Sequence, residues 1–204
     1  MKKKIFTICL LMIVSFSFAQ EDIKSKFGYG FGFGVGNGTL ENNQLGVLNG
    51  NILSLRFNID YSFTDKENTK LISGIEFLDF NANFYNGLNQ SKLKNEYLQV
   101  PLKISHRVGF GTEEKLNILV GAGMYANFLM RSKISSLEDK TNTKSGGVNF
   151  GYSVSFGMEY NLTSDTSIGV YSDVMSEINE IKNNGFEQKQ TEILLLNIGI
   201  STRF

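Results

Sequence analysis

The sequence FGYGFGFGVG, residues 27 to 36, places a large apolar side chain at every second position and a glycine between each pair. Successive side chains of a β-strand point to opposite faces, so this stretch predicts a strand with one apolar face and one nearly bare face. The same period of two returns in seven later stretches, and helical periodicity is nearly absent. The chain is therefore expected to be all-β.

The later stretches have the length of long strands. In most of them apolar residues occupy one face, and Gly, Ser, Asn and charged residues occupy the other. In one of them Ile75 and Phe77 share one parity, whereas Phe80 and Phe84 share the other, which predicts a β-bulge near Leu78. The eight predicted strands cover about residues 27–36, 53–63, 71–85, 97–107, 117–128, 149–160, 167–174 and 194–204.

The connections between these strands alternate in length. Those near 37–50, 86–94, 131–146 and 178–190 are long and polar, whereas those near 64–69, 109–114 and 161–165 are short. Long loops at one end, with short turns and both termini at the other, indicate an eight-stranded antiparallel up-and-down transmembrane β-barrel of a bacterial outer membrane. Aromatic residues fall near both predicted rims, as interfacial girdles require: Phe63, Phe110, Tyr160 and Phe204 near the short turns, and Phe84, Tyr97, Phe128 and Phe150 near the long loops.

Period-two patterning does not by itself say which face is inside, so a soluble barrel with an apolar interior stays an alternative. The glycines on the polar face favour a lumen, where they make room for long side chains, over a solvent face, where they only weaken the strand. Charges in a lumen are expected to be paired. The predicted lumen charge network consists of Arg56, Asp60, Glu76, Asp79, Lys103, Arg107, Arg131, Glu159, Asp173 and Arg203.

The first 19 residues have the order of a signal peptide, with lysines at 2 to 4, an apolar run from Ile5 to Phe18 and cleavage expected after Ala19. Residues 20–204 would then form the barrel domain. The whole chain balances 20 basic against 20 acidic residues, which disfavours a nucleic-acid partner. With one cysteine, Cys9, and one histidine, His106, a metal cluster built from His and Cys is excluded and no cofactor is predicted.

The neighbours Ser105 and His106 are the only pair that suggests nucleophilic catalysis. A nucleophile and its base must lie within hydrogen-bond reach, yet adjacent residues of a strand point to opposite faces. We therefore predict no catalytic residue.

Several motifs resemble those of the small outer-membrane β-barrel family common in Bacteroidota, which includes PorT-like proteins. They are Tyr97-Leu98-Gln99-Val100-Pro101-Leu102, the glycine-rich stretch from Val120 to Tyr125, the stretch from Phe150 to Tyr160, and the terminal Phe204. The resemblance implies the fold and the outer-membrane location. It also implies that Phe204 is the signal read by the outer-membrane insertion machinery, and that a role in protein secretion is conceivable, as in PorT-like members.

The leading functional prediction is a non-catalytic, monomeric barrel with a side-chain-filled, ion-paired lumen and a structural or surface-interaction role. The first alternative is a PorT-like secretion or transport component that engages another envelope protein. The second is a soluble, lipocalin-like barrel that binds a small apolar ligand. The expected partners are outer-membrane lipid and the insertion machinery, with another envelope protein as a partner in the secretion alternative.

Overall fold

The computed structural model describes residues 26–63, 68–86, 89–110, 115–136, 140–144, 146–183 and 186–203. The predicted signal peptide and the predicted insertion signal at Phe204 lie outside these ranges. Within them no helix is long and apolar enough to span a bilayer. The strands are β1 (Phe27–Asn42), β2 (Gly46–Ser62), β3 (Thr69–Asn86), β4 (Asn89–Phe110), β5 (Leu116–Ser136), β6 (Lys140–Lys144), β7 (Val148–Asn161), β8 (Thr166–Glu177), β9 (Ile181–Asn183) and β10 (Phe186–Arg203).

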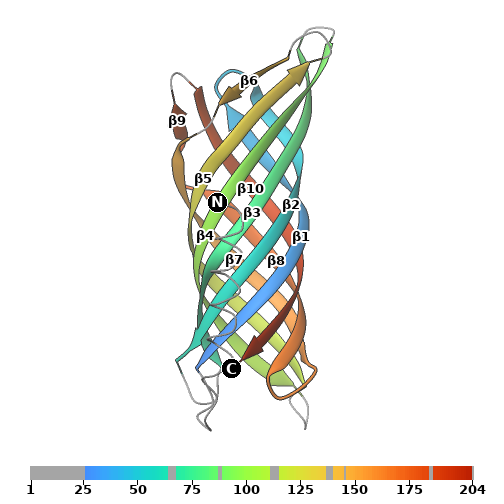
Figure 1. Ribbon diagram of the computed structural model, residues 1–204, viewed down its shortest axis with the longest axis vertical. Coiled ribbons are helices and arrows are strands. Elements are labelled where there is room, and N and C mark those ends of the chain that lie inside the picture. Colours follow the sequence, from blue (N-terminus) through green and yellow to red (C-terminus); the bar gives the residue numbers. More distant parts are fainter. Residues whose placement is uncertain are drawn as a thin grey trace, which may run out of the picture.

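Eight of these described strands form a closed antiparallel ring in the order β1-β2-β3-β4-β5-β7-β8-β10, and β10 pairs with β1 to close it (Figure 1). Gly28 pairs with Arg203, so the ring begins and ends at the same rim, the one with short turns. The two remaining strands, β6 and β9, extend β5 and β10 at the other rim. The predicted eight-stranded up-and-down barrel is confirmed.

The lower part of the barrel wall carries an outward apolar belt. On β4, the outward Leu102 and Ile104 are 56% and 55% exposed, whereas Gln99, on the inner face of the same strand, is fully buried. The apolar positions of β4 run from Leu98 to Val108, a length that matches the roughly 9 to 11 tilted residues that cross the hydrocarbon of a bilayer. This orientation agrees with the lipid-facing prediction and contradicts the soluble, lipocalin-like alternative.

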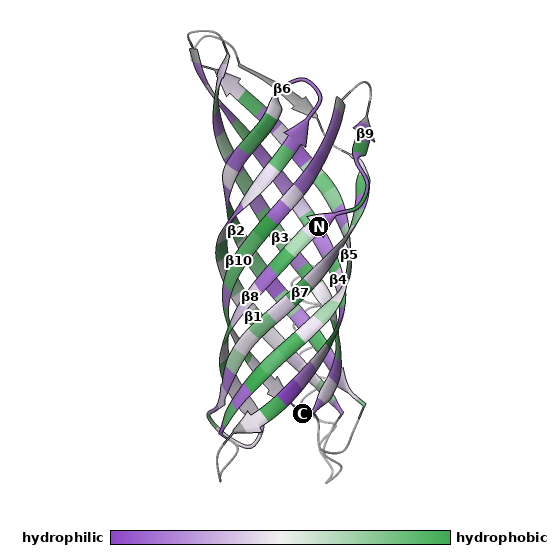
Figure 2. Ribbon diagram, turned by 180° about the vertical axis from the view of Figure 1, so that it is seen from behind, coloured by the Kyte–Doolittle hydropathy of each residue, from purple (hydrophilic) through white to green (hydrophobic). Residues whose placement is uncertain are grey.

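The strands are longer than predicted, up to 22 residues in β4, and they run through most of the segments expected to be loops. The reason is that the pattern inverts above the belt. Above Leu98, where the outward apolar belt of β4 begins, the outward residues are the charged Lys94 and Glu96. On the inner face at the same height, the apolar Leu93 and Tyr97 are buried. Strand alternation continues, but water replaces lipid outside, so the polar and apolar faces exchange sides. Figure 2 shows hydrophilic segments along the upper ends of several strands.

This inversion, and no bulge, explains the pattern around Leu78. The pairing of β3 with β2 is continuous from Lys70 to Ala82, and Glu76, Leu78 and Phe80 are all buried on the same inner face. The predicted bulge is therefore wrong. The register does shift on β5, where Leu129 pairs with Tyr97 but Arg131 pairs with Glu96.

The inner faces of the upper strands form an apolar core inside the barrel. Tyr97 belongs to it, and Phe84 packs against it, so neither lies in the predicted outer aromatic girdle. Phe150, at 50% exposed, does face outward near that rim, as do Phe63 and Tyr160 near the other. The core consists of Leu40, Leu48, Ile52, Leu78, Phe80, Ala82, Leu93, Tyr97, Tyr125, Leu129, Met175, Ile181, Ile193 and Leu195.

Candidate functional site

The lower half of the lumen contains a layer of paired charges, with Arg56 of β2 at its centre. One nitrogen of Arg56, Nη2, donates to both oxygens of Glu76 on β3 at 3.0 Å and to Oδ2 of Asp173 on β8 at 2.7 Å. Lys103 of β4 reaches the other oxygen of Asp173 at 2.8 Å, and Asn197 of β10 donates to its Oδ2 at 2.9 Å. These contacts join five strands across the lumen, because inward positions of opposite walls meet in a barrel this narrow.

Two further ion pairs lie closer to the short-turn rim. Arg107 of β4 donates to both oxygens of Glu159 on β7 at 2.8 Å, and Glu159 also accepts hydrogen bonds from Ser167 and Ser201. Lys70 and Asp60 pair at 3.3 Å. Each cation in this layer has a carboxylate partner, which is what a buried charge requires to be tolerated.

Glycines on the inner face make room for this layer, as the sequence predicts. A Cβ at Gly28 would lie 2.8 Å from Oδ2 of Asp60, and one at Gly157 would lie 2.7 Å from the ring of Tyr171. Those distances are too short for real Cβ contacts, so a larger residue at either position displaces the charged or aromatic group opposite.

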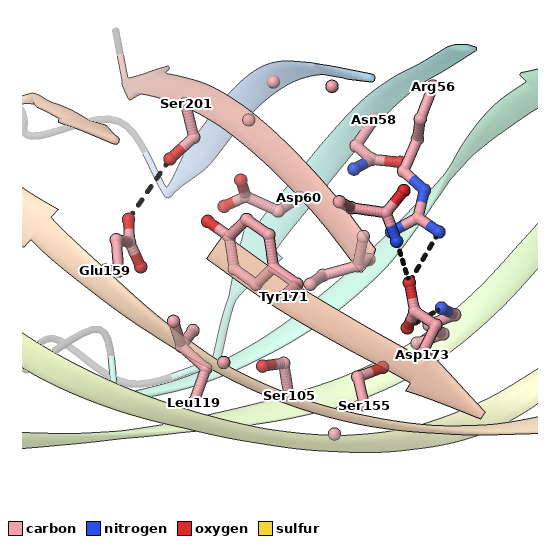
Figure 3. Close-up of a pocket in the computed structure, with 18 of the residues that line it drawn as sticks. Arg56, Asn58, Asp60, Ser105, Leu119, Ser155, Glu159, Tyr171, Asp173 and Ser201 are labelled. Carbon is pink, nitrogen blue, oxygen red and sulfur yellow. Dashed lines mark hydrogen bonds and ion pairs between the residues drawn. The ribbon is translucent and has the colours of Figure 1, made fainter. Parts of the chain in front are cut away.

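A cavity of about 100 Å³ remains inside the charged layer. Figure 3 shows Tyr171 between the Glu159–Ser201 contact on one side and the Arg56–Asp173 contact on the other. Nε of Arg56 and Oδ1 of Asn58 are buried and have no hydrogen-bond partner in the described part of the protein. A cavity of this size next to unpartnered polar atoms suits a few water molecules.

The structure brings eight of the ten predicted network residues to the inner face. Seven of them make the ion pairs above, and the eighth, Arg203, is half-buried beside Asp60 at the lower rim. The other two predictions are wrong. Asp79 lies on the outer surface and pairs there with Lys94 at 2.8 Å, because the pattern inverts just below it. Arg131 is exposed, because the register shift on β5 turns it outward.

Two inner charged residues were not predicted. Lys70 lies just outside the predicted strand 71–85, and Glu177 lies beyond the predicted strand 167–174. Lys70 nevertheless has the parity of the inner residue Glu76 on β3, and Glu177 has that of Asp173 on β8. Extending the alternation of each strand beyond its apolar stretch would have predicted that Lys70 and Glu177 point inward.

Glu177 lies higher in the lumen and is held by neutral donors. Its carboxylate accepts hydrogen bonds from Asn127 at 2.7 Å, from Asn149 at 2.9 Å and from the backbone nitrogen of Gln190 at 2.5 Å. The residue is 2% exposed. These three bonds tie β5, β7 and β10 to the end of β8.

Ser105 and His106 point to opposite sides of the wall, as strand alternation predicts. Ser105 is buried on the inner face, whereas His106 is exposed on the outer face, where its ring contacts the hydroxyl of Thr69 at 2.9 Å. This pair cannot act as a nucleophile and its base.

A closed ring of eight strands with an outward apolar belt and a charged, packed interior defines an integral β-barrel protein of the outer membrane. The chain belongs to the outer membrane protein beta-barrel domain family, whose model matches residues 6–195. None of the curated protein sequences matches it.

Similar solved structures include Neisserial surface protein A, with 15% identity over 90% of this chain and 100% of that chain and a TM-score of 0.55. The N-terminal β-barrel domain of OprF from Pseudomonas aeruginosa has 13% identity over 89% of this chain and 100% of that chain, with a TM-score of 0.45. Ail, the attachment invasion locus protein of Yersinia pestis, has 13% identity over 88% and 99% of the two chains, with a TM-score of 0.44. At such low identity the likeness to Neisserial surface protein A shows the fold alone.

Proposed function

We propose that the protein is a monomeric, non-catalytic outer-membrane barrel with a closed lumen, whose raised wall and loops make contacts at the cell surface. The observation that carries this proposal is the packed apolar core inside the upper barrel, above the layer of ion pairs. An open channel requires a solvent-filled path, and the side chains of this core are almost inaccessible to solvent.

The charged layer also favours a structural role for the lumen. Its cations and carboxylates alternate and pair, as in the contacts of Arg56 and Lys103 with Asp173, so they form no ring of one sign that would select ions. Paired charges that bridge opposite walls hold a barrel in one shape.

The height of the wall supports a role at the surface. β3, β4 and β5 have 18, 22 and 21 residues, whereas roughly 9 to 11 suffice to cross the bilayer. The excess stands on the long-loop side, which faces the cell exterior in this class of barrel. Rigid scaffolds that carry loops commonly serve recognition.

A PorT-like secretion or transport role remains the alternative proposal. A transport role would require the upper core to move, and no feature of the lumen favours that. Planar-bilayer recording separates the two proposals: the closed barrel should give no steady current at any voltage that the bilayer tolerates, with a general porin as the positive control. A reproducible, steady conductance would contradict the closed lumen.

Exposure at the cell surface is tested by labelling intact cells with a membrane-impermeant maleimide. The exported chain is expected to lack cysteine, so single substitutions report one site each. Tyr85→Cys, at a 77% exposed residue of the long-loop end, should label, whereas Ser164→Cys, in a short turn, should label only after lysis. The reverse pattern would contradict the proposed orientation.

A further inference from the structure

The outer surface just above the apolar belt is unevenly charged around the barrel. On the β3–β5 side, four cations stand with two carboxylates in one cluster, which we name the basic patch. On the opposite side, formed by β1, β2, β10 and the adjoining β9, the described outward charged residues of the same upper region are two lysines and four glutamates: Lys182, Lys189, Glu41, Glu180, Glu187 and Glu192. One side is therefore net positive and the other net negative. The basic patch consists of Lys92, Lys94, Arg131, Lys133, Asp79 and Glu96.

The pairing of the strands brings the patch together. Lys94 lies opposite Lys133, and Glu96 lies opposite Arg131, on neighbouring strands β4 and β5. Lys94 contacts Asp79 at 2.8 Å and Glu96 at 3.3 Å, so both carboxylates of the patch are engaged by one lysine. Lys92, Arg131 and Lys133 make none of the ion pairs found among the described residues.

The register shift on β5 is what puts Arg131 in this patch. Below the shift, Tyr125, Asn127 and Leu129 are buried on the inner face at every second position, and continued alternation would turn Arg131 inward as well. Because the bulge inserts one extra residue, Met130 and Arg131 are both exposed, and Ser132 is the next residue that points inward. β-bulges commonly re-aim a side chain in this way. Here the bulge adds a cation to the outer surface.

The patch borders the lipid belt directly. On β4, going from the belt toward the long-loop end, the outward residues are Leu98, then Glu96, then Lys94. On β5, in the same direction, the exposed Met130 comes directly before Arg131. In an outer-membrane barrel this boundary lies on the long-loop side, at the level of the lipid headgroups of the outer leaflet. The patch is thus placed to meet headgroups.

We propose that the basic patch binds the phosphate groups of a phosphorylated glycolipid of the outer leaflet, so that this lipid docks on the β3–β5 side of the barrel. Arg131, Lys133 and Lys92 supply the cations, and Arg131 offers a planar fork that suits phosphate oxygens. Clusters of Lys and Arg beside a membrane span are the usual sites of anionic headgroups. Lys94 pairs with both carboxylates and so offsets part of their charge.

The test measures binding of diphosphorylated lipid A to the folded, detergent-solubilised protein by native mass spectrometry. The variant Arg131→Gln/Lys133→Gln removes two cations of the patch, and Lys182→Gln/Lys189→Gln removes two cations outside it. Removal of two headgroup-level cations should weaken binding by roughly tenfold or more. The control should stay within about twofold of the wild type. Equal weakening in both variants, or no weakening in either, would overturn the proposal.

Lipid A from which both phosphates have been removed is the second probe, and it should bind no more tightly to the wild type than to the patch variant. Tighter binding to the wild type would show that sugar or acyl contacts, and not phosphate, dominate, which also overturns the proposal. Should Arg131→Gln disturb the bulge and prevent folding, Lys92→Gln/Lys133→Gln leaves the bulge intact and is held to the same criterion. Migration of the unheated protein in a gel reports folding of every variant.

Discussion

Arg56 and Asp173, 117 residues apart in the chain, meet in the lumen with Nη2 and Oδ2 separated by 2.7 Å. The same nitrogen holds Glu76 of the adjacent strand, so one side chain connects the two sides of the barrel. Both carboxylates are nearly inaccessible to solvent. Arg56 is thus a cation shared by two buried carboxylates from different strands.

Replacing Arg56 by Leu should destabilise the folded barrel strongly, because it leaves two buried carboxylates with one fewer cation. Loss of one partner of a buried pair costs about 3–5 kcal/mol. The measurement is urea-induced unfolding in detergent, followed by the gel shift between folded and unfolded forms. Glu41→Gln, on the outer surface, is the control and should change the free energy of unfolding by less than about 0.5 kcal/mol. Equal effects would mean that the charge network does not stabilise the barrel.

The pair formed by Arg107 and Glu159 should behave as a structural pair. Glu159→Met alone should destabilise by about 3–5 kcal/mol because Arg107 loses its buried partner. The double variant Arg107→Met/Glu159→Met should recover most of that loss, since apolar side chains of similar volume often replace a buried pair without penalty. A double variant as unstable as the sum of its single variants would show that the two side chains act independently.

Glu177→Gln should destabilise the barrel by about 1–3 kcal/mol, although it keeps the shape of the side chain. An amide offers one oxygen where the carboxylate accepts from Asn127, Asn149 and the backbone of Gln190, so at least one buried donor loses its partner. Glu187→Gln makes the same chemical change at a residue near the rim and should be almost neutral. Unfolding in urea measures both, and a neutral Glu177→Gln would show that the three bonds are not needed.

The exchange of faces along β3 can be followed by fluorescence, because the chain has no native tryptophan. Phe77 is 53% exposed in the lipid belt, whereas Phe80, three residues on, is fully buried inside. In vesicles with brominated acyl chains, emission of Phe77→Trp should be quenched and that of Phe80→Trp should not. If overpacking prevents the second variant from folding, Tyr97→Trp reports on the same core. Quenching inside the barrel would refute the upper core.

Much of the fold could be predicted from the lower halves of the strands, where each apolar residue faces lipid and each polar residue faces the lumen. Arg56, Glu76, Lys103 and Asp173 were placed on the inner face because they alternate with such apolar residues. Strand parity carries that information without any knowledge of long-range contacts.

The upper halves could not be read in the same way. Period-two alternation reports that a strand is amphipathic, but the face that turns inward depends on whether lipid or water lies outside. On β3 the inner residue is polar at Glu76 but apolar at Phe80, and the outer residue is apolar at Phe77 but polar at Asp79. In the sequence this exchange looks like the change of parity that a bulge produces. The bulge at Met130 has no such signature, and alternation alone therefore predicts the wrong side for Arg131.

The ion pairs and the apolar core lie one above the other, so in the proposed closed barrel they form two barriers in series. A substitution that loosens the ionic layer leaves the packed core above it, and one that thins the core leaves the paired charges below it. Acquiring a leak would thus demand simultaneous changes in two chemically unlike layers. If the lumen is closed as proposed, a single substitution in either layer is not expected to open a leak through the barrel.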